Sequence, residues 1–238
     1  MSRPRVNFYI DGFNLYKGIV QEMRDNYPAA PNCKWLDIRK LAIELKSRKD
    51  KLESIKFFTA LIPPRNKRSK GMRDRQDAYL SAIGSLDKVQ IIKGEYITKT
   101  EPLTIETNCD IEGCQYKEFI VDKETYKEKQ TDVNIATEML KDAYEGNCEK
   151  MHLICGDGDL KAAIELIAKS NPPKATVVVH FPKGRECRVL KPVCSTYFDL
   201  NRYVLQNCLL PNLVNVDGVD IECPPKWTVN LERPLPNL

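Results

Sequence analysis

Short apolar runs alternate with segments of helical spacing along most of the chain. The strand-like runs cover residues 6–10, 55–62, 89–92, 151–155 and 175–181. Apolar residues recur at helical spacing in 36–49, 72–86, 131–144 and 160–167. The last strand-like run is continuous and β-branched, which is typical of a strand covered on both faces. This alternation predicts an α/β fold, a three-layer α/β/α sandwich around a mainly parallel central sheet.

Two segments break this rhythm. Residues 94–129 hold short strand-like pieces around a turn, and we interpret them as an insertion. Residues 209–238 carry five prolines without a sustained period, which predicts a Pro-rich C-terminal tail that is draped on the surface or partly disordered. Residues 1–208, which include the insertion, are predicted to form one domain.

Composition narrows the class of protein. With 238 residues and 42% hydrophobic content, the chain can bury a large core. The net charge of +4 makes no case for nucleic acid by itself, so such a case must rest on where the charges lie. The apolar run near the N-terminus is too short for a secretory signal, and no stretch is long enough for a membrane span. Nine scattered cysteines suit reduced thiols, so we expect a cytoplasmic protein without a membrane partner.

Four aspartates lie at positions where open α/β sheets usually carry their functional residues. Asp11 ends the first apolar run, Asp132 opens a helix-like segment, and Asp157 and Asp159 follow the run at 151–155. Acids at the carboxyl ends of parallel strands can converge in one crevice. Two carboxylates about 4 Å apart repel by roughly 4 kcal/mol at an effective dielectric near 20, so such a cluster needs protons or cations. Mg²⁺ and Mn²⁺ favour oxygen ligands and bind phosphate, which indicates a phosphoryl-transfer site.

Basic residues gather after the second predicted strand. They are Arg65, Lys67, Arg68, Lys70, Arg73 and Arg75, and Lys183 and Arg185 follow the fifth strand. A charge run is often only a solvated face of a helix. Its place after a strand end also suits a track for a phosphate backbone on the same rim as the acids, with salt-dependent affinity. Both interpretations stay open at this point.

Three motifs carry a family likeness. The segments at 10–16 (IDGFNLY), 128–136 (EKQTDVNIA) and 155–160 (CGDGDL) together resemble the NYN domain, one of the PIN-like metal-dependent nucleases. The likeness is strongest to the LabA-like bacterial branch and covers roughly residues 5–200. It implies a PIN-like α/β/α sandwich that hydrolyses RNA with Mg²⁺ or Mn²⁺ held by aspartates.

Carried over by position, the resemblance assigns the site. Asp11, Asp132, Asp157 and Asp159 match the acidic, metal-binding and catalytic set, and Asn14 matches the polar residue beside the first acid. Two positions depart from the pattern. Cys155 stands where the family usually has serine, and Ser195 stands where an acid is common. Neither departure touches the aspartates.

Other motifs in the sequence fit their usual functions less well. Gly156 and Gly158 fail as a dinucleotide fingerprint because Lys161 takes the place of the third glycine. Cys109 and Cys114 have the spacing of two zinc ligands but lack a second pair. We therefore predict a metal-dependent ribonuclease acting on RNA, single-stranded rather than duplex, and leave a homo-oligomer open. The alternatives are a catalytically silent NYN-type module that binds RNA or protein, and a metal-dependent phosphatase acting on small phosphate esters.

Overall fold

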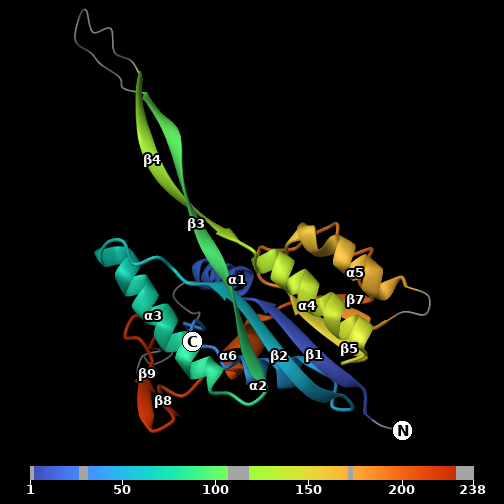
Figure 1. Ribbon diagram of the computed structural model, residues 1–238. Helices are drawn as coiled ribbons and strands as arrows, with labels where there is room; N and C mark the ends of the chain where they lie inside the picture. Colours follow the sequence, from blue (N-terminus) through green and yellow to red (C-terminus); the bar gives the residue numbers. More distant parts are fainter. Residues whose placement is uncertain (1–2, 27–31, 107–117, 171–173, 229–238) are drawn as a thin grey trace, which may run out of the picture.

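A seven-stranded sheet forms the centre of the protein in this computed structural model, which describes residues 3–26, 32–106, 118–170 and 174–228 (Figure 1). The strand order is β4-β3-β2-β1-β5-β6-β7, and only β4 is antiparallel to its neighbour. The strands are β1 (Arg5–Asp11), β2 (Lys51–Ala60), β3 (Val89–Glu106), β4 (Glu118–Lys129), β5 (Lys150–Ile154), β6 (Thr176–Phe181) and β7 (Thr196–Asp199). The predicted three-layer α/β/α fold with a mainly parallel sheet is confirmed.

Helices cover both faces of this sheet. The helices are α1 (Gly12–Asp25), α2 (Ile38–Leu45), α3 (Lys67–Gly84), α4 (Thr131–Glu145), α5 (Lys161–Ala168) and α6 (Arg202–Asn207), with a short 3-10 turn η1 (Gly158–Leu160) before α5. Helices α4 and α5 lie together on one face, and α1, α2, α3 and α6 lie on the other (Figure 1).

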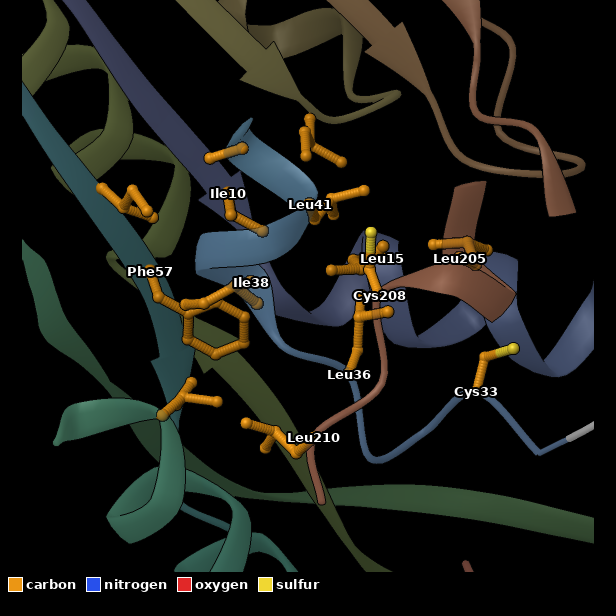
Figure 2. Packing of buried hydrophobic residues seen from close by; sticks show 14 of the residues in the cluster. Ile10, Leu15, Cys33, Leu36, Ile38, Leu41, Phe57, Leu205, Cys208 and Leu210 are labelled. Carbon is orange, nitrogen blue, oxygen red and sulfur yellow. The ribbon is translucent and has the colours of Figure 1, made fainter. Parts of the chain in front are cut away.

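Alternate residues of the central strands feed two separate cores. Phe8 and Ile10 pack toward α1, α2 and α6, whereas Tyr9 packs toward α4 and α5. Figure 2 shows the first of these cores. Leu36, just before α2, and Ile38, its first residue, lie in the same cluster as Leu205 of α6 and the buried residues that follow it. Because both faces are buried, the strands show nearly continuous apolar runs.

Helix α1 is the main element that the hydrophobic pattern did not predict. It begins directly after β1, and the carboxylate of Asp11 caps it by accepting hydrogen bonds from the backbone N–H groups of Phe13 and Asn14. A Cβ at Gly12 would lie 2.6 Å from the Phe57 ring, so glycine lets α1 pack closely on β2. The residue that ends the strand therefore also starts the helix.

Helix α3 begins earlier than its apolar spacing indicated. Asn66 and Ser69 form a capping box, so the helix starts at Lys67 and includes most of the basic run. The cations weaken the apolar period over its first turns, which explains why the sequence showed only residues 72–86. Helix α2 is capped by Asp37, whose side chain accepts hydrogen bonds from the backbone N–H groups of Arg39 and Lys40.

The segment interpreted as an insertion forms most of a long antiparallel arm. Strands β3 and β4 extend beyond the helices as a two-stranded ribbon (Figure 1). The root of the ribbon is part of the main sheet, because residues Val89 to Gly94 pair with β2. The ribbon therefore continues an existing strand and is not a separate unit.

The described C-terminal segment is ordered against the body. A hairpin of β8 (Leu213–Val216) and β9 (Val219–Glu222) packs on α3, and Trp227 makes an edge contact with Tyr79, with ring centroids 6.2 Å apart. These residues lie in the segment predicted to be a Pro-rich tail. In the described parts of the chain, no helix is both long enough and apolar enough to cross a membrane.

Candidate acidic site at the carboxyl edge of the sheet

The topology creates a crevice between β1 and β5. These strands are parallel neighbours, but the chain continues from β1 toward β2 and β3 on one side and from β5 toward β6 and β7 on the other. Such a switch point opens a crevice at the carboxyl ends of the strands. Asp11 is the last residue of β1, and Asp157 follows β5 closely. The sheet therefore brings these two residues to the same edge, as the sequence predicted.

Asp11 is buried and fully engaged by its neighbours. Its side chain belongs to a residue that is only 2% exposed, and its Oδ1 accepts from two backbone N–H groups of α1. Its Oδ2 accepts from the side-chain amide of Asn14 and, at 3.3 Å, from the thiol of Cys155. Asn14 thus orients Asp11, in agreement with the position that the resemblance gave it.

Cys155 links the acids that follow the two strands. Its Sγ donates to Asp11 and accepts from the backbone N–H of Asp157 at 3.2 Å. Burial, followed by the charge of Asp11, raises the pKa of this thiol well above its usual value, so it stays protonated and donates. A cysteine can therefore fill the hydrogen-bonding place of the family's serine.

Asp132 reaches the site through an unusual backbone step. Gln130 has φ +74°, in the left-handed region, where the chain turns from β4 into α4. Burial, and then the charges of Asp157 and Asp11, raise the pKa of Asp132 to about 6. Asp159 and Glu128 add to the same effect. The cluster therefore carries more negative charge than its own surroundings neutralise.

Glu128 is an acid of this cluster that sequence reasoning did not assign. Its pKa is raised by burial and also by the charge of Asp11, while a hydrogen bond from the Thr131 hydroxyl opposes the shift. The signal was present in the sequence, since Glu128 opens the motif that contains Asp132. Only the return of β4 to the body shows that it faces the acids.

The donor set fits a hard divalent cation, although its oxygens do not converge in this structure. Within the described ranges, no three His, Cys, Asp or Glu side chains lie close enough together to hold a metal ion. Asp132 and Asp159 make no side-chain hydrogen bond or ion pair to the described residues, so their oxygens are available. Carboxylate oxygens with a surplus of negative charge are the ligands that Mg²⁺ and Mn²⁺ prefer.

The predicted basic residues divide into separate groups. Arg65 and Arg75 line a pocket beside the acids. Arg73 pairs with Asp77 at 2.7 Å, and Lys183 lies 4.0 Å from Asp25. The others in α3, Lys67, Arg68 and Lys70, are exposed along its first turns.

The loop after β6 contacts the acidic site through its backbone. A Cβ at Gly156 would lie 1.8 Å from the carbonyl oxygen of Arg185, so only glycine allows this approach. The contact places the loop of Lys183 and Arg185 beside the turn that carries Asp157. The predicted extension of the basic track thus reaches the edge of the sheet next to the acids.

A pocket of about 420 Å³ adjoins the acidic edge. Its walls come from α1, the end of β2, α3, the root of the β3–β4 arm and Trp227. Glu128 belongs to both the pocket and the acidic cluster, and the pocket residues Gly12 and Phe13 follow Asp11 directly. Sequence reasoning missed this pocket because Tyr96, Lys34 and Trp227 come from distant segments without a shared motif.

A serine and two histidines from the central strands and their ends lie away from the acidic residues or are buried. Ser195 bonds to the backbone of Val177 at the amino end of β7, so it lies away from the carboxyl edge. His152 and His180 are buried, with His152 Nδ1 and His180 Nε2 2.9 Å apart. Cys109 and Cys114 lie outside the described residues.

A family model for the NYN domain matches residues 5–201. The chain belongs to the NYN domain family. This assignment agrees with the three sequence motifs, and it gives the protein a PIN-like, nuclease-type fold. The more specific LabA-like branch stays a prediction.

Individual relatives are more distant. Over 198 residues the chain is 26% identical to 6-hydroxy-3-succinoylpyridine 3-monooxygenase HspA of Pseudomonas putida, a match that covers 75% of this chain. The chain spans 60% of the length of that relative. The crystal structure of a protein of unknown function from Vibrio parahaemolyticus is similar over 88% of this chain and 98% of that one, with a TM-score of 0.47 and 12% identity.

Proposed function

We propose that this NYN-domain protein is a metal-dependent ribonuclease. The observation that supports this most directly is the uncompensated acidic cluster at the switch point, where burial and then the charges of neighbouring carboxylates raise the pKa of Asp132 to about 6. A family of nuclease-type fold supports the choice of reaction. Phosphate recognition would come from the cations of α3 and of the loop after β6.

Each acid has a proposed role that follows from its contacts. Asp132, Asp157 and Asp159 would hold Mg²⁺ or Mn²⁺ together with Asp11, and Glu128 would add negative charge to the site. When bound, the cation would supply Lewis-acid stabilisation of the scissile phosphate and a lower pKa for an attacking water. Asn14 and Cys155 keep Asp11 in place through their hydrogen bonds.

Asp132 is a better position for testing this function than Asp11. Asp11 caps α1 and bonds to two side chains, so its substitution would disturb folding as well as charge. Asp132 makes no such bonds to the described residues, and Asp132→Asn keeps the size of the side chain. Glu145→Gln is the matched control, because it neutralises an exposed acid at the opposite end of the same helix.

The experiment compares labelled single-stranded RNA, duplex RNA, single-stranded DNA and a small phosphate ester, each with Mg²⁺, Mn²⁺ or EDTA. We expect the wild type and Glu145→Gln to cleave RNA only with metal, and Asp132→Asn to lose cleavage. RNA binding without cleavage by the wild type would instead identify a silent RNA-binding module. Hydrolysis of the small ester alone would identify a phosphatase. Either of these results would overturn the ribonuclease proposal.

A further inference from the structure

The pocket beside the acidic edge has a lining suited to a flat ring. Its lining includes Phe13 and Tyr16 of α1, Tyr79 of α3, Trp227, and Tyr96 at the root of the arm. We call this site the aromatic pocket. Phe13 and Tyr16 are 44% and 40% exposed, so part of their surface faces outward without packing in the core. Pockets of this volume and lining are typical of small-ligand sites.

The aromatic pocket also has basic side chains in its lining. Lys34 and Arg75 both line it, and Lys34 lies with its Nζ 5.9 Å from the centroid of the Tyr16 ring. Neither cation forms an ion pair with a carboxylate in the described parts of the chain. Burial, then the charges of Arg75 and Arg24, lower the pKa of Lys34. An anionic group on the ligand would relieve this repulsion.

The ligand must therefore combine an aromatic ring with an anionic group. A nucleotide has both, and the aromatic pocket is continuous with the acidic site through Glu128 and Gly12. A base held there would place the adjoining stretch of its strand beside the acids. We propose that the aromatic pocket binds one nucleotide of an RNA strand, with the base among its aromatic side chains and a phosphate against Lys34 and Arg75.

This proposal rests on the function proposed above for the identity of the strand, but its test does not depend on cleavage. Binding of a mononucleotide, AMP or UMP, is measured by calorimetry in EDTA, where no metal-dependent hydrolysis occurs. Ribose 5-phosphate serves as a ligand without a base. Nicotinate, an aromatic carboxylate, serves as an anionic ring without sugar or phosphate.

Two substitutions have matched controls elsewhere on the molecule. Tyr16→Ala removes a half-exposed ring of the pocket, and Tyr144→Ala removes an exposed tyrosine on α4 that also has a lysine, Lys174, near its ring. Arg75→Glu reverses a charge of the pocket, and Arg48→Glu makes the same change on an exposed arginine in the turn before β2.

We expect each pocket variant to weaken mononucleotide binding at least about 5-fold, the lower end of the effect of one stacked aromatic side chain. Each control should leave the affinity within about 2-fold of the wild type, and melting temperatures should show that all variants are folded. Ribose 5-phosphate and nicotinate should bind at least about 5-fold more weakly than the nucleotide. Tighter binding of nicotinate, or equal effects of pocket variants and controls, would overturn the proposal. Cleavage by the wild type would be unaffected by that result, so the two proposals can fail separately.

Discussion

Two groups of charged side chains lie on the same sheet, and they differ in how their charge is balanced. On the face covered by α4, the Nζ of Lys56 contacts Asp142 Oδ2 at 2.6 Å and Glu138 Oε2 at 2.7 Å. Tyr9 and Asn7 also donate to Asp142. At the carboxyl edge, by contrast, Asp132 forms no ion pair with the described residues, and the neighbouring charges that act on it are those of other acids.

The direction of the pKa shifts records this difference. Burial alone would raise the pKa of Asp142, but hydrogen bonds from Lys56 and Tyr9 hold it below its usual value. The pKa of Asp132 is instead raised to about 6 by burial and by neighbouring acids. A buried charge that its neighbours neutralise has a structural explanation. Negative charge that the neighbouring residues leave unbalanced indicates that an ion or ligand from outside the chain completes the site.

The largest effect is expected at the balanced group. Lys56→Met would leave Asp142 and Glu138 without their cation, and breaking a buried pair in this way costs about 3 to 5 kcal/mol. The free energy of unfolding, measured by urea denaturation, should fall by that amount. Lys169→Met removes an exposed partner of Glu165 and should cost less than about 1 kcal/mol. Equal losses for the two variants would contradict a structural role for the buried group.

The uncompensated group should respond in the opposite way. Asp132→Asn removes one of several like charges, so its melting temperature should stay equal to that of the wild type or rise. Its metal-dependent RNA cleavage should fall about 100-fold or more, a loss comparable to removal of one electrostatic contact in a catalytic site. A drop in melting temperature with cleavage retained would show that Asp132 is structural, like Asp142.

A buried histidine pair tests the comparison through the pH dependence of stability. His152 and His180 are stacked in the core, and burial lowers their pKa values to about 4 and about 3, with the charge of His152 adding to the second shift. The nearby charges of Asp50 and Lys150 act on His152 in opposite directions. As pH falls below about 6.5, the unfolded chain takes up protons that the folded state refuses, so stability declines toward pH 4.

The size of this pH effect can be isolated with a substitution. Each histidine contributes a slope of at most about 1.4 kcal/mol per pH unit in this window. His180→Phe should therefore flatten the fall in unfolding free energy between pH 6.5 and 4.5, as measured by urea denaturation at several pH values. An unchanged slope would show that the pair does not set the acid sensitivity of the fold.

The smallest effect is expected at the exposed cations of α3. Arg68→Ala should lower the slope of log affinity against log salt for single-stranded RNA by about 0.7, the contribution of one phosphate contact. Stability should not change, because Arg68 is exposed. Fluorescence anisotropy at several salt concentrations measures the slope, with Lys169→Ala on α5 as a control. An unchanged slope would make this part of α3 a solvated face.

The fold class and the family follow from local features of the amino-acid sequence. Alternating apolar runs and helical spacing are local patterns, and they predicted the central strands and helices α2, α4 and α5. The three motifs placed the aspartates at strand ends and helix starts. The apolar pattern did not predict helix α1, because Asp11 ends β1 and caps α1 without an intervening turn.

Which of these residues share an environment depends on the folding of the chain in three dimensions. Glu128 returns to the acids at the end of a long arm, and Trp227 reaches Tyr79 from the far end of the chain. Charge balance also depends on which residues come together in space. Asp132 and Asp142 lie on one helix but have opposite pKa shifts. The strength of an electrostatic interaction depends on distance and burial in space, and neither can be read from separation along the chain.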